Sequence, residues 1–315
     1  MGIHEKKILT VTLNPAVDKT YETQSVMVGN VNRMRSVINI AGGKGINVTK
    51  ILREYDYPVI ATGFLGGYPG KFIEEEMLKR GVTCGFLHLS EDTRSNMNIL
   101  ADDGFVTEIL EPGPVVSRQS QREFLARYEG LLERCMLVIL SGSLPVGVDT
   151  NMYQRLVIGA REVGVPVYLD SSGESMRFGM EAKPQLIKPN WKELEYLAGH
   201  KIEDREELIE AAHQIHQEGI EKVVVSMGSK GLVSVSDEGV YYARAEHIKA
   251  VNTVACGDSV VASYAMSYWL EESDKDALLR ACAISVANAT TRESASIPKQ
   301  TAEELMKAIQ VEALA

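Results

Sequence analysis

The stretch L208-I-E-A-A-H-Q-I-H-Q-E-G-I-E-K-V-V-V-S-M227 joins a helical pattern to a strand pattern. Its apolar residues recur at helical spacing along one face of the segment 203–218, and Gly219 follows where that helix would stop. The run 222–227 is short and rich in β-branched residues, which is typical of a strand buried on both faces. A helix that leads into such a strand is half of a βαβ unit, so this stretch indicates an α/β fold.

The same alternation runs through most of the chain. Further β-branched runs lie between helical patterns, at residues 8–13, 58–66, 136–140, 165–170 and 185–188. The alternation predicts a mostly parallel sheet that is covered by helices on both faces. No Pro/Ser-rich linker and no internal repeat interrupts the sequence. We therefore expect one α/β domain over residues 1–315.

The composition is that of a globular, acidic protein. The chain has 315 residues, of which 45% are apolar and 24% charged, enough for a sizeable core without disulfides or a metal. With 43 acidic and 33 basic residues the formal net charge is -10, which argues against nucleic acid and membrane surfaces as partners. The four cysteines are scattered, and no segment has the apolar length of a signal peptide or a membrane span. We therefore expect a cytoplasmic protein.

Two stretches, about 19–40 and 86–111, break the alternation because they are extended patterns without crossover helices. The second contains an apparent hairpin over residues 95–110, with Asp103-Gly104 at its turn. A small β-sheet lid added to the α/β body would account for both stretches. Edge strands of the main sheet would account for them equally well, so the sequence leaves these two alternatives open.

The segment N252-T-V-A-C-G-D-S-V-V-A-S-Y-A-M266 predicts a turn of small residues that opens an apolar helix. The backbone N–H groups and the dipole at such a helix start favour a bound anion. Asp258 falls in the first turn beside that anion, which would repel it. Its presence there is explained if it accepts a proton from a nearby hydroxyl. The alternative is that Asp258 only complements the helix dipole.

The chain resembles the PfkB branch of the ribokinase-like sugar kinases in four motifs that occur in the order and spacing typical of that family. They are A41-G-G-K-G-I-N47, S141-G-S-L-P145, K188-P-N-W-K-E193 and T253-V-A-C-G-D258. Four shorter motifs look most like the tagatose-6-phosphate kinase and 1-phosphofructokinase subgroup: T12-L-N-P-A-V-D18, V31-N-R33, T93-R94 and T107-E-I-L-E111. The resemblance covers essentially the whole chain. It implies a three-layer α/β/α, Rossmann-like fold with a mostly parallel sheet and a small β-sheet lid.

The resemblance implies that Asp258 is the general base that deprotonates the acceptor hydroxyl. The backbone of Ala255, Cys256 and Gly257 would form an anion hole for the transferring phosphoryl group. The family usually has G-A-G-D at this place, whereas this chain has alanine and cysteine in the first two positions. An alanine is strained if the first position needs a positive φ, so the geometry of this turn becomes the question for the structure.

For the sugar, the resemblance implies contacts from two motifs near the N-terminus. Asp18 would bond to sugar hydroxyls. Gly43 and Asn47 would contact the sugar, and Lys44 would face phosphate groups. Taken alone, an aspartate after N14-P15 is typical of a turn, and G42-G-K-G45 is typical of a turn and helix start; it is not a Walker A loop.

A substrate that already carries a phosphate needs cationic partners, preferably the planar fork of arginine. Arg33 and Arg94 match the positions that hold this phosphate in the subgroup, and Ser143 matches a hydroxyl that assists. Without the resemblance, each arginine would be an ordinary solvated side chain. Arg35 is a near neighbour that could be confused with Arg33.

The N190-x-x-E193 motif follows a proline and matches a helix-capping pattern. In the family the same motif also orders Mg²⁺ near the ATP phosphates, and one glutamate suffices because Mg²⁺ keeps most of its waters. The resemblance therefore implies a metal role for Glu193. The residues that it implies for ATP binding are Lys188, Asn190, Ser226, Gly228 and, on the adenine side, Asn288.

Together these implications predict an ATP- and Mg²⁺-dependent kinase that phosphorylates the free primary hydroxyl of a ketohexose monophosphate. D-Tagatose 6-phosphate, giving the 1,6-bisphosphate, is the first choice. Fructose 1-phosphate is the alternative, since the same pocket could hold a sugar in the opposite orientation, and a 6-phosphofructokinase is a further one. By family analogy we expect a homodimer formed through the lid.

Three other functions have weaker support in the sequence. A non-catalytic sugar-phosphate sensor is favoured only by the unusual Ala255-Cys256 pair, and it would leave Asp258 and Glu193 without a role. A dinucleotide-dependent oxidoreductase lacks the G-x-G-x-x-G turn after the first strand. A metal site at E210-x-x-H-x-x-H216 is disfavoured because its polar neighbours indicate a solvated helix surface.

Overall fold

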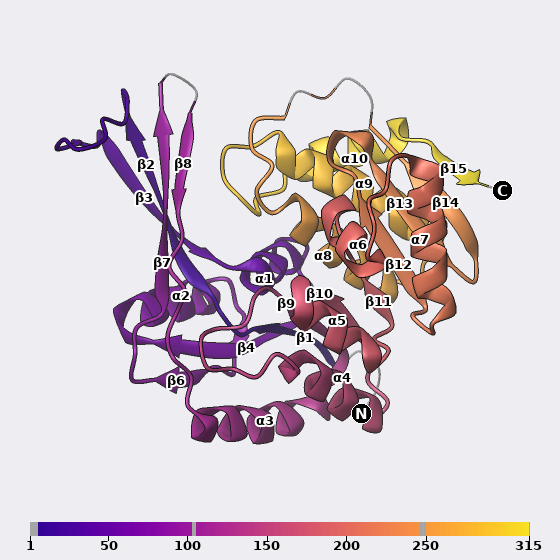
Figure 1. Cartoon of the computed structure of the whole chain (residues 1–315), viewed down its shortest axis with the longest axis horizontal. Coiled ribbons are helices and arrows are strands. Elements are labelled where there is room, and N and C mark those ends of the chain that lie inside the picture. The colour runs from indigo at the N-terminus through magenta and orange to yellow at the C-terminus, as the bar shows by residue number, and fades with distance from the viewer. Residues whose placement is uncertain (1–5, 103–104, 246–247, 249, 315) are drawn as a thin grey trace.

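The computed structural model describes residues 6–102, 105–245, 248 and 250–314 (Figure 1). In this part of the chain eleven strands form one sheet, with the main order β15-β14-β13-β12-β11-β10-β9-β1-β4-β5 and β6 paired to β4. The strands are β1 Lys7–Thr12, β4 Val59–Gly66, β5 Thr83–Cys84, β6 Leu87–Leu89, β9 Cys135–Ser141, β10 Val167–Asp170, β11 Leu186–Ile187, β12 Lys222–Ser226, β13 Leu232–Ser236, β14 Gly239–Ala243 and β15 Val311–Leu314.

The sheet from β5 and β6 to β12 is parallel, and β13, β14 and β15 extend it in antiparallel pairing. This arrangement confirms the predicted mostly parallel sheet. The six β-branched runs predicted as strands coincide with β1, β4, β9, β10, β11 and β12. Their unbroken apolar character follows from burial on both faces.

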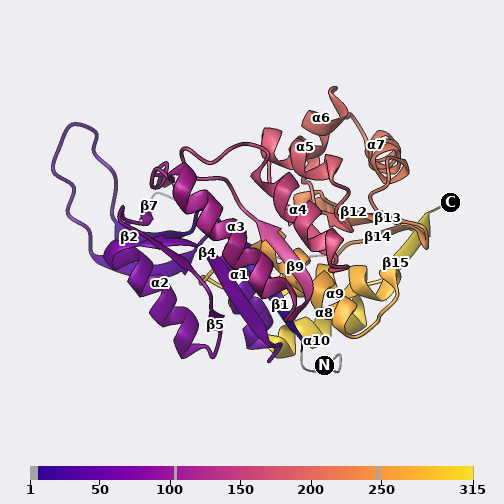
Figure 2. The same cartoon turned by 90° about the horizontal axis from the view of Figure 1, so that it is seen from below.

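Helices cover both faces of the sheet, as Figure 2 shows from below. On β12, Val223 and Val225 face a core shared with α3 to α7, whereas Val224 faces a core shared with α1, α8, α9 and α10. The helices are α1 Lys44–Glu54, α2 Gly67–Lys79, α3 Arg118–Leu132, α4 Met152–Glu162, α5 Gly173–Glu181, α6 Trp191–Ala198, α7 Arg205–Gln217, α8 Cys256–Trp269, α9 Asp274–Ala289 and α10 Lys299–Ala308.

The helix predicted over 203–218 is α7, and its start has a local cause. Asp204 caps α7 by accepting a hydrogen bond from the Glu207 backbone at 2.9 Å. His216 at the other end contacts Ile220 O at 2.7 Å and Asp237 at 3.2 Å. No group of three His, Cys, Asp or Glu side chains in the described residues is arranged to hold a metal ion. Glu210 and His213 are exposed, which agrees with the interpretation of this segment as helix surface.

A second, four-stranded sheet projects from one side of the body (Figure 1). It consists of β3 Ser36–Gly42, β2 Ala16–Thr23, β7 Arg94–Ala101 and β8 Val106–Ile109, in that order. These strands form a sheet of their own and are not edge strands of the main sheet. Of the two alternatives that the sequence left open, the small separate sheet is therefore the one that the structure shows. We call this sheet the lid.

The lid strands differ in extent from the predicted stretches. The first predicted stretch is 19–40, whereas β2 begins at Ala16 and β3 ends at Gly42. The second stretch, 86–111, also includes β6, which pairs with β4 of the main sheet and not with the lid. The β7–β8 pair is antiparallel as the hairpin pattern predicted, but its Asp103-Gly104 turn lies outside the described residues. Among the helices that are described, none is long and apolar enough to cross a membrane.

Candidate active site

Asp258 lies in the first turn of α8 and is only 6% exposed. Asn47, on α1, donates a hydrogen bond from Nδ2 to Asp258 Oδ2 at 2.8 Å. Because Asn47 is itself buried within α1, it holds the carboxylate from the facing helix. The structure thus brings together two residues from the first and last of the four family motifs.

Burial raises the pKa of Asp258 to about 6, and the negative charge of Asp170 adds to this effect. The ammonium of Lys44, the Asn47 amide and the ammonium of Lys188 oppose it. A carboxyl with this pKa is still mostly ionised at neutral pH, yet is more basic than an exposed aspartate. That combination suits a general base.

Two lysine side chains converge on Asp170, which ends β10 and is fully buried. Lys44 Nζ lies 3.0 Å and Lys188 Nζ 3.4 Å from Asp170 Oδ1. Burial would by itself raise the pKa of Asp170, but Lys188 and Lys44 lower it below the ordinary range. Burial likewise disfavours the Lys44 cation, but Asp170, Glu193 and Asp258 outweigh it and raise the Lys44 pKa. This cluster therefore keeps cations next to Asp258.

Asp170 is a residue that the sequence reasoning missed. A signal was present, because an aspartate closes the run V165-P-V-Y-L-D170 and the carboxyl ends of parallel strands gather at one edge of the sheet. Its Oδ2 atom is buried and has no hydrogen-bond partner among the described residues. A buried acceptor of this kind can still take a bond from a ligand.

The turn before α8 has the backbone geometry that the sequence put in question. Ala255 is the N-cap of α8 with φ 66° and ψ 6°, in the left-handed region that favours glycine. The expected strain at this alanine is therefore present. A Cβ on Gly257 would lie 3.3 Å from Lys188 Nζ, so the ammonium closely approaches the backbone of the turn. The Cys256 N–H donates to Thr253 O at 3.3 Å. The N–H groups at a helix start and a nearby cation together can hold an anion.

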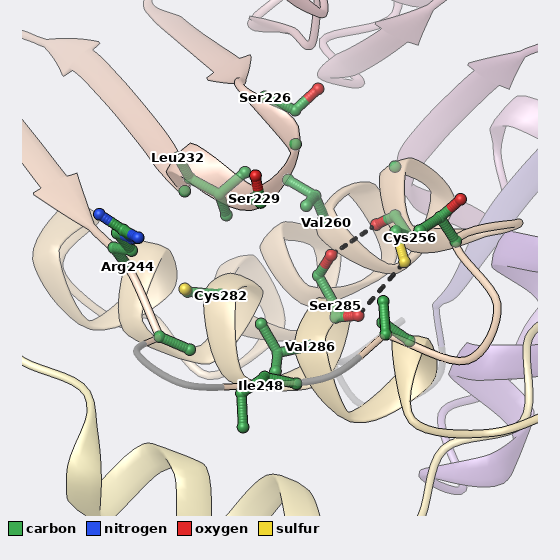
Figure 3. Close-up of a pocket in the computed structure, with 17 residues that line it drawn as sticks. Ser226, Ser229, Leu232, Arg244, Ile248, Cys256, Val260, Cys282, Ser285 and Val286 are labelled. Atoms are coloured by element: carbon green, nitrogen blue, oxygen red, sulfur yellow. Dashed lines mark hydrogen bonds between the residues drawn. The ribbon is translucent and has the colours of Figure 1, made fainter.

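A cavity of about 310 Å³ adjoins this turn (Figure 3). Figure 3 shows Ser226, Ser229 and Leu232 on one side of it and Cys256, Ser285 and Val286 on another. Ser226 and Gly228, both predicted on the nucleotide side, line the cavity, and so do Cys256 and Gly257 of the turn. The cavity therefore connects the predicted nucleotide loop with the start of α8.

Asn288 supports this turn from behind and is not among the residues that line the cavity. Its Nδ2 donates to Val254 O at 2.8 Å and contacts Cys256 Sγ at 3.4 Å, while its Oδ1 accepts from the Ala295 backbone at 2.9 Å. The side chain is 1% exposed. The structure therefore shows Asn288 as a support of the turn, because the loops on either side bind both ends of its amide. Its contact on the adenine side stays a prediction.

Asn190 and Glu193 form the capping box that their spacing predicted. Asn190 Oδ1 accepts from the Glu193 backbone at 2.9 Å, and Glu193 Oε2 accepts from the Asn190 backbone at 2.8 Å. The capping interpretation is confirmed. The negative charge of Glu193 also acts on Lys44, which places the start of α6 on the same side as the Asp170 cluster.

The predicted sugar side is built at the base of the lid. Asp18, on β2, accepts a hydrogen bond from Asn96 Nδ2 at 2.8 Å. Arg94 Nη2 donates to Asn14 O at 3.1 Å, and Asn14 Nδ2 in turn donates to Ser143 Oγ at 3.3 Å. Asn14 thus links Arg94 to Ser143, and Asn96 holds Asp18; the sequence reasoning singled out neither asparagine. The two groups adjoin because Arg94 and Asn96 lie on β7, which pairs with β2.

Position 43, immediately before α1, requires a glycine for steric reasons. Its φ is 102°, and a Cβ there would lie 3.0 Å from Pro15 Cα. This close approach places the glycine-rich turn against the loop that leads into β2 and Asp18.

Arg33 does not join this group within one chain. It is exposed in the loop between β2 and β3. In both views that loop forms the end of the lid opposite α8 (Figures 1 and 2). Arg33 is predicted from the V31-N-R33 motif alone, and a local motif does not reveal how far the lid extends from the body. The neighbouring Arg35 pairs with Asp102 at 3.0 Å across the lid.

Comparison with known proteins agrees with this geometry. Residues 11–302 match the family model described as pfkB family carbohydrate kinase. The chain belongs to this family. It is an ATP-dependent sugar kinase, and its mixed α/β body with a small separate sheet is the ribokinase-like fold of that family.

Two tagatose-6-phosphate kinases from strains of Staphylococcus epidermidis are each 37% identical over 307 residues, covering 96% of this chain and 99% of theirs. A possible 1-phosphofructokinase from Thermotoga maritima is similar at a TM-score of 0.88 and 28% identity, covering 98% of this chain and all of its own (100%). Phosphofructokinase-2 from Escherichia coli in complex with potassium shares the fold at a TM-score of 0.91 and 24% identity, with coverage of 96% and 99%.

We predict that Ala255→Gly leaves the catalytic rate of the kinase unchanged or raises it. Relief of the left-handed strain is worth about 1–2 kcal/mol, whereas the lost methyl burial and the extra freedom of glycine each cost just under 1 kcal/mol. The free energy of unfolding should thus change by about 1 kcal/mol at most. Urea unfolding and steady-state kinetics measure the two quantities.

The matched control is Ala295→Gly, because Ala295 is also left-handed, at φ 57°, but lies outside the cavity. It should change stability similarly without changing the rate. A large loss of turnover in Ala255→Gly alone would show that the alanine methyl is needed at the anion hole.

Proposed function

We propose that this kinase transfers the γ-phosphoryl group of ATP to the free primary hydroxyl of D-tagatose 6-phosphate, producing D-tagatose 1,6-bisphosphate. The observation that carries the proposal is the buried Asp258, held by Asn47 at 2.8 Å beside the turn that lines the cavity of about 310 Å³. The two tagatose-6-phosphate kinases at 37% identity support the choice of sugar.

In the proposed reaction, Asp258 accepts the proton of the sugar hydroxyl as its oxygen bonds to the γ-phosphorus. The bond from that phosphorus to the bridging oxygen breaks, and ADP leaves with the electron pair. Charge accumulates on the transferring group, so fixed donors and cations stabilise it without reorganising. The N–H groups of the 255–257 turn and the ammonium of Lys188 are the proposed donors, and the Cys256 N–H would exchange its bond to Thr253 O for one to the phosphoryl group.

ATP would occupy the cavity, with its phosphates toward the turn at Cys256 and Gly257. Ser226 and Gly228 are the proposed contacts, and Asn288 acts through the loop that it supports. Lys188 and the start of α6 at Asn190 lie on the phosphate side. Because this kinase depends on ATP, we place its activity in the cytoplasm.

The donors around the Asp170 cluster fit Mg²⁺, which prefers a few carboxylate oxygens together with water. Asp170 Oδ2 is a buried acceptor without a partner among the described residues, and Glu193 uses only Oε2 in its capping box. These two carboxylates would hold the ion, directly or through water. When bound, Mg²⁺ would neutralise charge on the ATP phosphates.

The sugar phosphate would bind at the base of the lid. Asp18, Gly43 and Asn47 are the proposed contacts to the sugar itself, and Lys44 would face phosphate groups. Arg94 and Ser143, linked through Asn14, are the proposed partners of the phosphate already on the sugar. A chain with a net charge of -10 needs such a local cationic site to bind an anionic substrate.

A panel of acceptor sugars tests the proposal. Formation of ADP is measured with tagatose 6-phosphate, fructose 6-phosphate, fructose 1-phosphate, tagatose and fructose, with a reaction without sugar as the blank. We expect the highest kcat/KM for tagatose 6-phosphate and a loss of about 10²-fold or more for the sugars without phosphate.

Two outcomes of the panel would change the assignment. Preference for fructose 1-phosphate would establish the alternative that the likeness to the Thermotoga protein favours. Equal use of phosphorylated and free sugars would contradict the phosphate site at Arg94.

We propose further that two copies of the kinase pair through their lids. The lid carries exposed apolar residues on its edge strand β3, where Val37 is 53% and Ile38 55% exposed, and in the loop before it, where Val28 is 94% exposed. Exposed apolar side chains at the unpaired edge of a sheet are costly in water and favour a second copy as partner. Arg33 remains a proposed ligand of the sugar phosphate only if pairing of the lids brings it to the site of the other copy.

Sedimentation velocity tests this pairing. The chain should sediment at twice the mass of one copy, and Ile38→Lys should shift it toward the monomer because a buried charge opposes association. Val163→Lys is the matched control, since Val163 is 57% exposed at the end of α4, away from the lid. A wild-type monomer at all accessible concentrations would refute the dimer.

A further inference from the structure

A buried asparagine lies directly beside the aspartate that we assign to the sugar. Asp18 on β2 and Asn96 on β7 are paired residues in the parallel ladder of the lid. Asn96 Nδ2 donates to Asp18 Oδ1 at 2.8 Å. On the other side, a Cβ on Gly42 would lie only 1.9 Å from Asp18 Oδ2, so the carboxylate occupies the space that this glycine leaves. The Asp18 side chain is thus held between two neighbouring strands.

The Oδ1 atom of Asn96 forms no hydrogen bond that would stabilise the fold among the described residues. Asn96 is 9% exposed, and its Oδ1 is buried without a hydrogen-bond partner among the described residues. Turning the amide over would place this oxygen against the Asp18 carboxylate, where the two acceptors would repel each other. A buried acceptor without a partner is unfavourable, and an apolar residue would avoid that cost. The asparagine is therefore explained by its single donor to Asp18.

We propose that Asn96 is a positioning residue for the sugar, which acts by holding Asp18 in the orientation that binds the sugar hydroxyls. This inference rests on the role proposed above for Asp18. It adds a residue that touches no substrate and that determines sugar affinity through one hydrogen bond.

The charges around Asp18 make this hydrogen bond important. Burial raises the pKa of Asp18, and the Asn96 hydrogen bond is the largest of the opposing effects. Lys50 on α1 and Arg94 on β7 also lower this pKa, while Glu108 on β8 raises it. Removing the Asn96 amide should therefore raise the pKa further. A carboxyl that protonates at higher pH loses its function as an acceptor earlier as the pH falls.

The test is a double-mutant cycle with Asp18→Asn, Asn96→Ala and the combination of the two. A hydrogen bond to a charged group accounts for about ten- to a hundredfold in affinity. We expect Asn96→Ala to raise KM for tagatose 6-phosphate by about that factor, with KM for ATP nearly unchanged. In the Asp18→Asn background the second substitution should have little additional effect.

Asn98→Ala is the matched control. Asn98 lies two residues along β7, in register with Thr20, and has no contact with Asp18 in the ladder. It should leave sugar KM and its pH dependence unchanged. In Asn96→Ala, by contrast, the acid limb of kcat/KM for the sugar should move to higher pH. If Asn96→Ala folds poorly, Asn96→Ser replaces it, with calorimetric binding of the sugar phosphate as the readout.

The outcomes separate two failures. If Asp18→Asn raises sugar KM but Asn96→Ala has the same effect in both backgrounds, or no effect, then Asn96 does not act through Asp18 and the inference is overturned. If Asp18→Asn itself leaves sugar KM unchanged, the role of Asp18 in the proposed function fails first, and the inference falls with it.

Discussion

The hydrogen bond from Asn47 to Asp258 joins α1 to α8 across 211 residues of sequence, and the rest of the site depends on it. A carboxylate buried this deeply is poorly solvated and favours its neutral form. A neutral amide can orient it without adding charge, while Lys44 and Lys188 favour its ionised form. These cations are in turn stabilised by Asp170, so each buried charge in the cluster has a compensating neighbour.

The α/β fold makes this cluster possible. Parallel strands bring their carboxyl ends to one edge of the sheet. Asp170 ends β10, Lys188 follows β11 and Ser226 ends β12, so all three lie at that edge. Helix α8 lies with α1 on the face of the sheet opposite to α3–α7, and its N-terminus reaches the same edge. Helix α1 carries Lys44 and Asn47 three residues apart, so both lie on one side of that helix. The lid then supplies Asp18 and Arg94 from a second sheet. Sugar, base and nucleotide cavity are thus held by different parts of the fold.

Patterns that repeat along the chain were predictable from the sequence. The β-branched runs became strands because burial on both faces leaves few residue types to choose from, and the capping box at Asn190 formed because its bonds are local. Residues that depend on distant partners were not predictable. An aspartate at the end of a strand has many explanations, so Asp170 was overlooked, and nothing in V31-N-R33 revealed that the lid carries Arg33 away from α8. The left-handed backbone of Ala255 was expected only through the family pattern.

The central claim is that Asp258 removes the proton of the sugar hydroxyl, and the pH dependence of the phosphoryl-transfer step tests it most directly. In the wild type this rate should fall as the pH drops through about 6, because the buried carboxyl then takes up a proton before it can act as a base. In Asp258→Asn the rate should be lower by about 10² to 10⁴ at every pH and show no acid limb, with both substrates still bound in calorimetry. A variant that transfers phosphate at nearly the wild-type rate, or that keeps the same acid limb, would contradict the account.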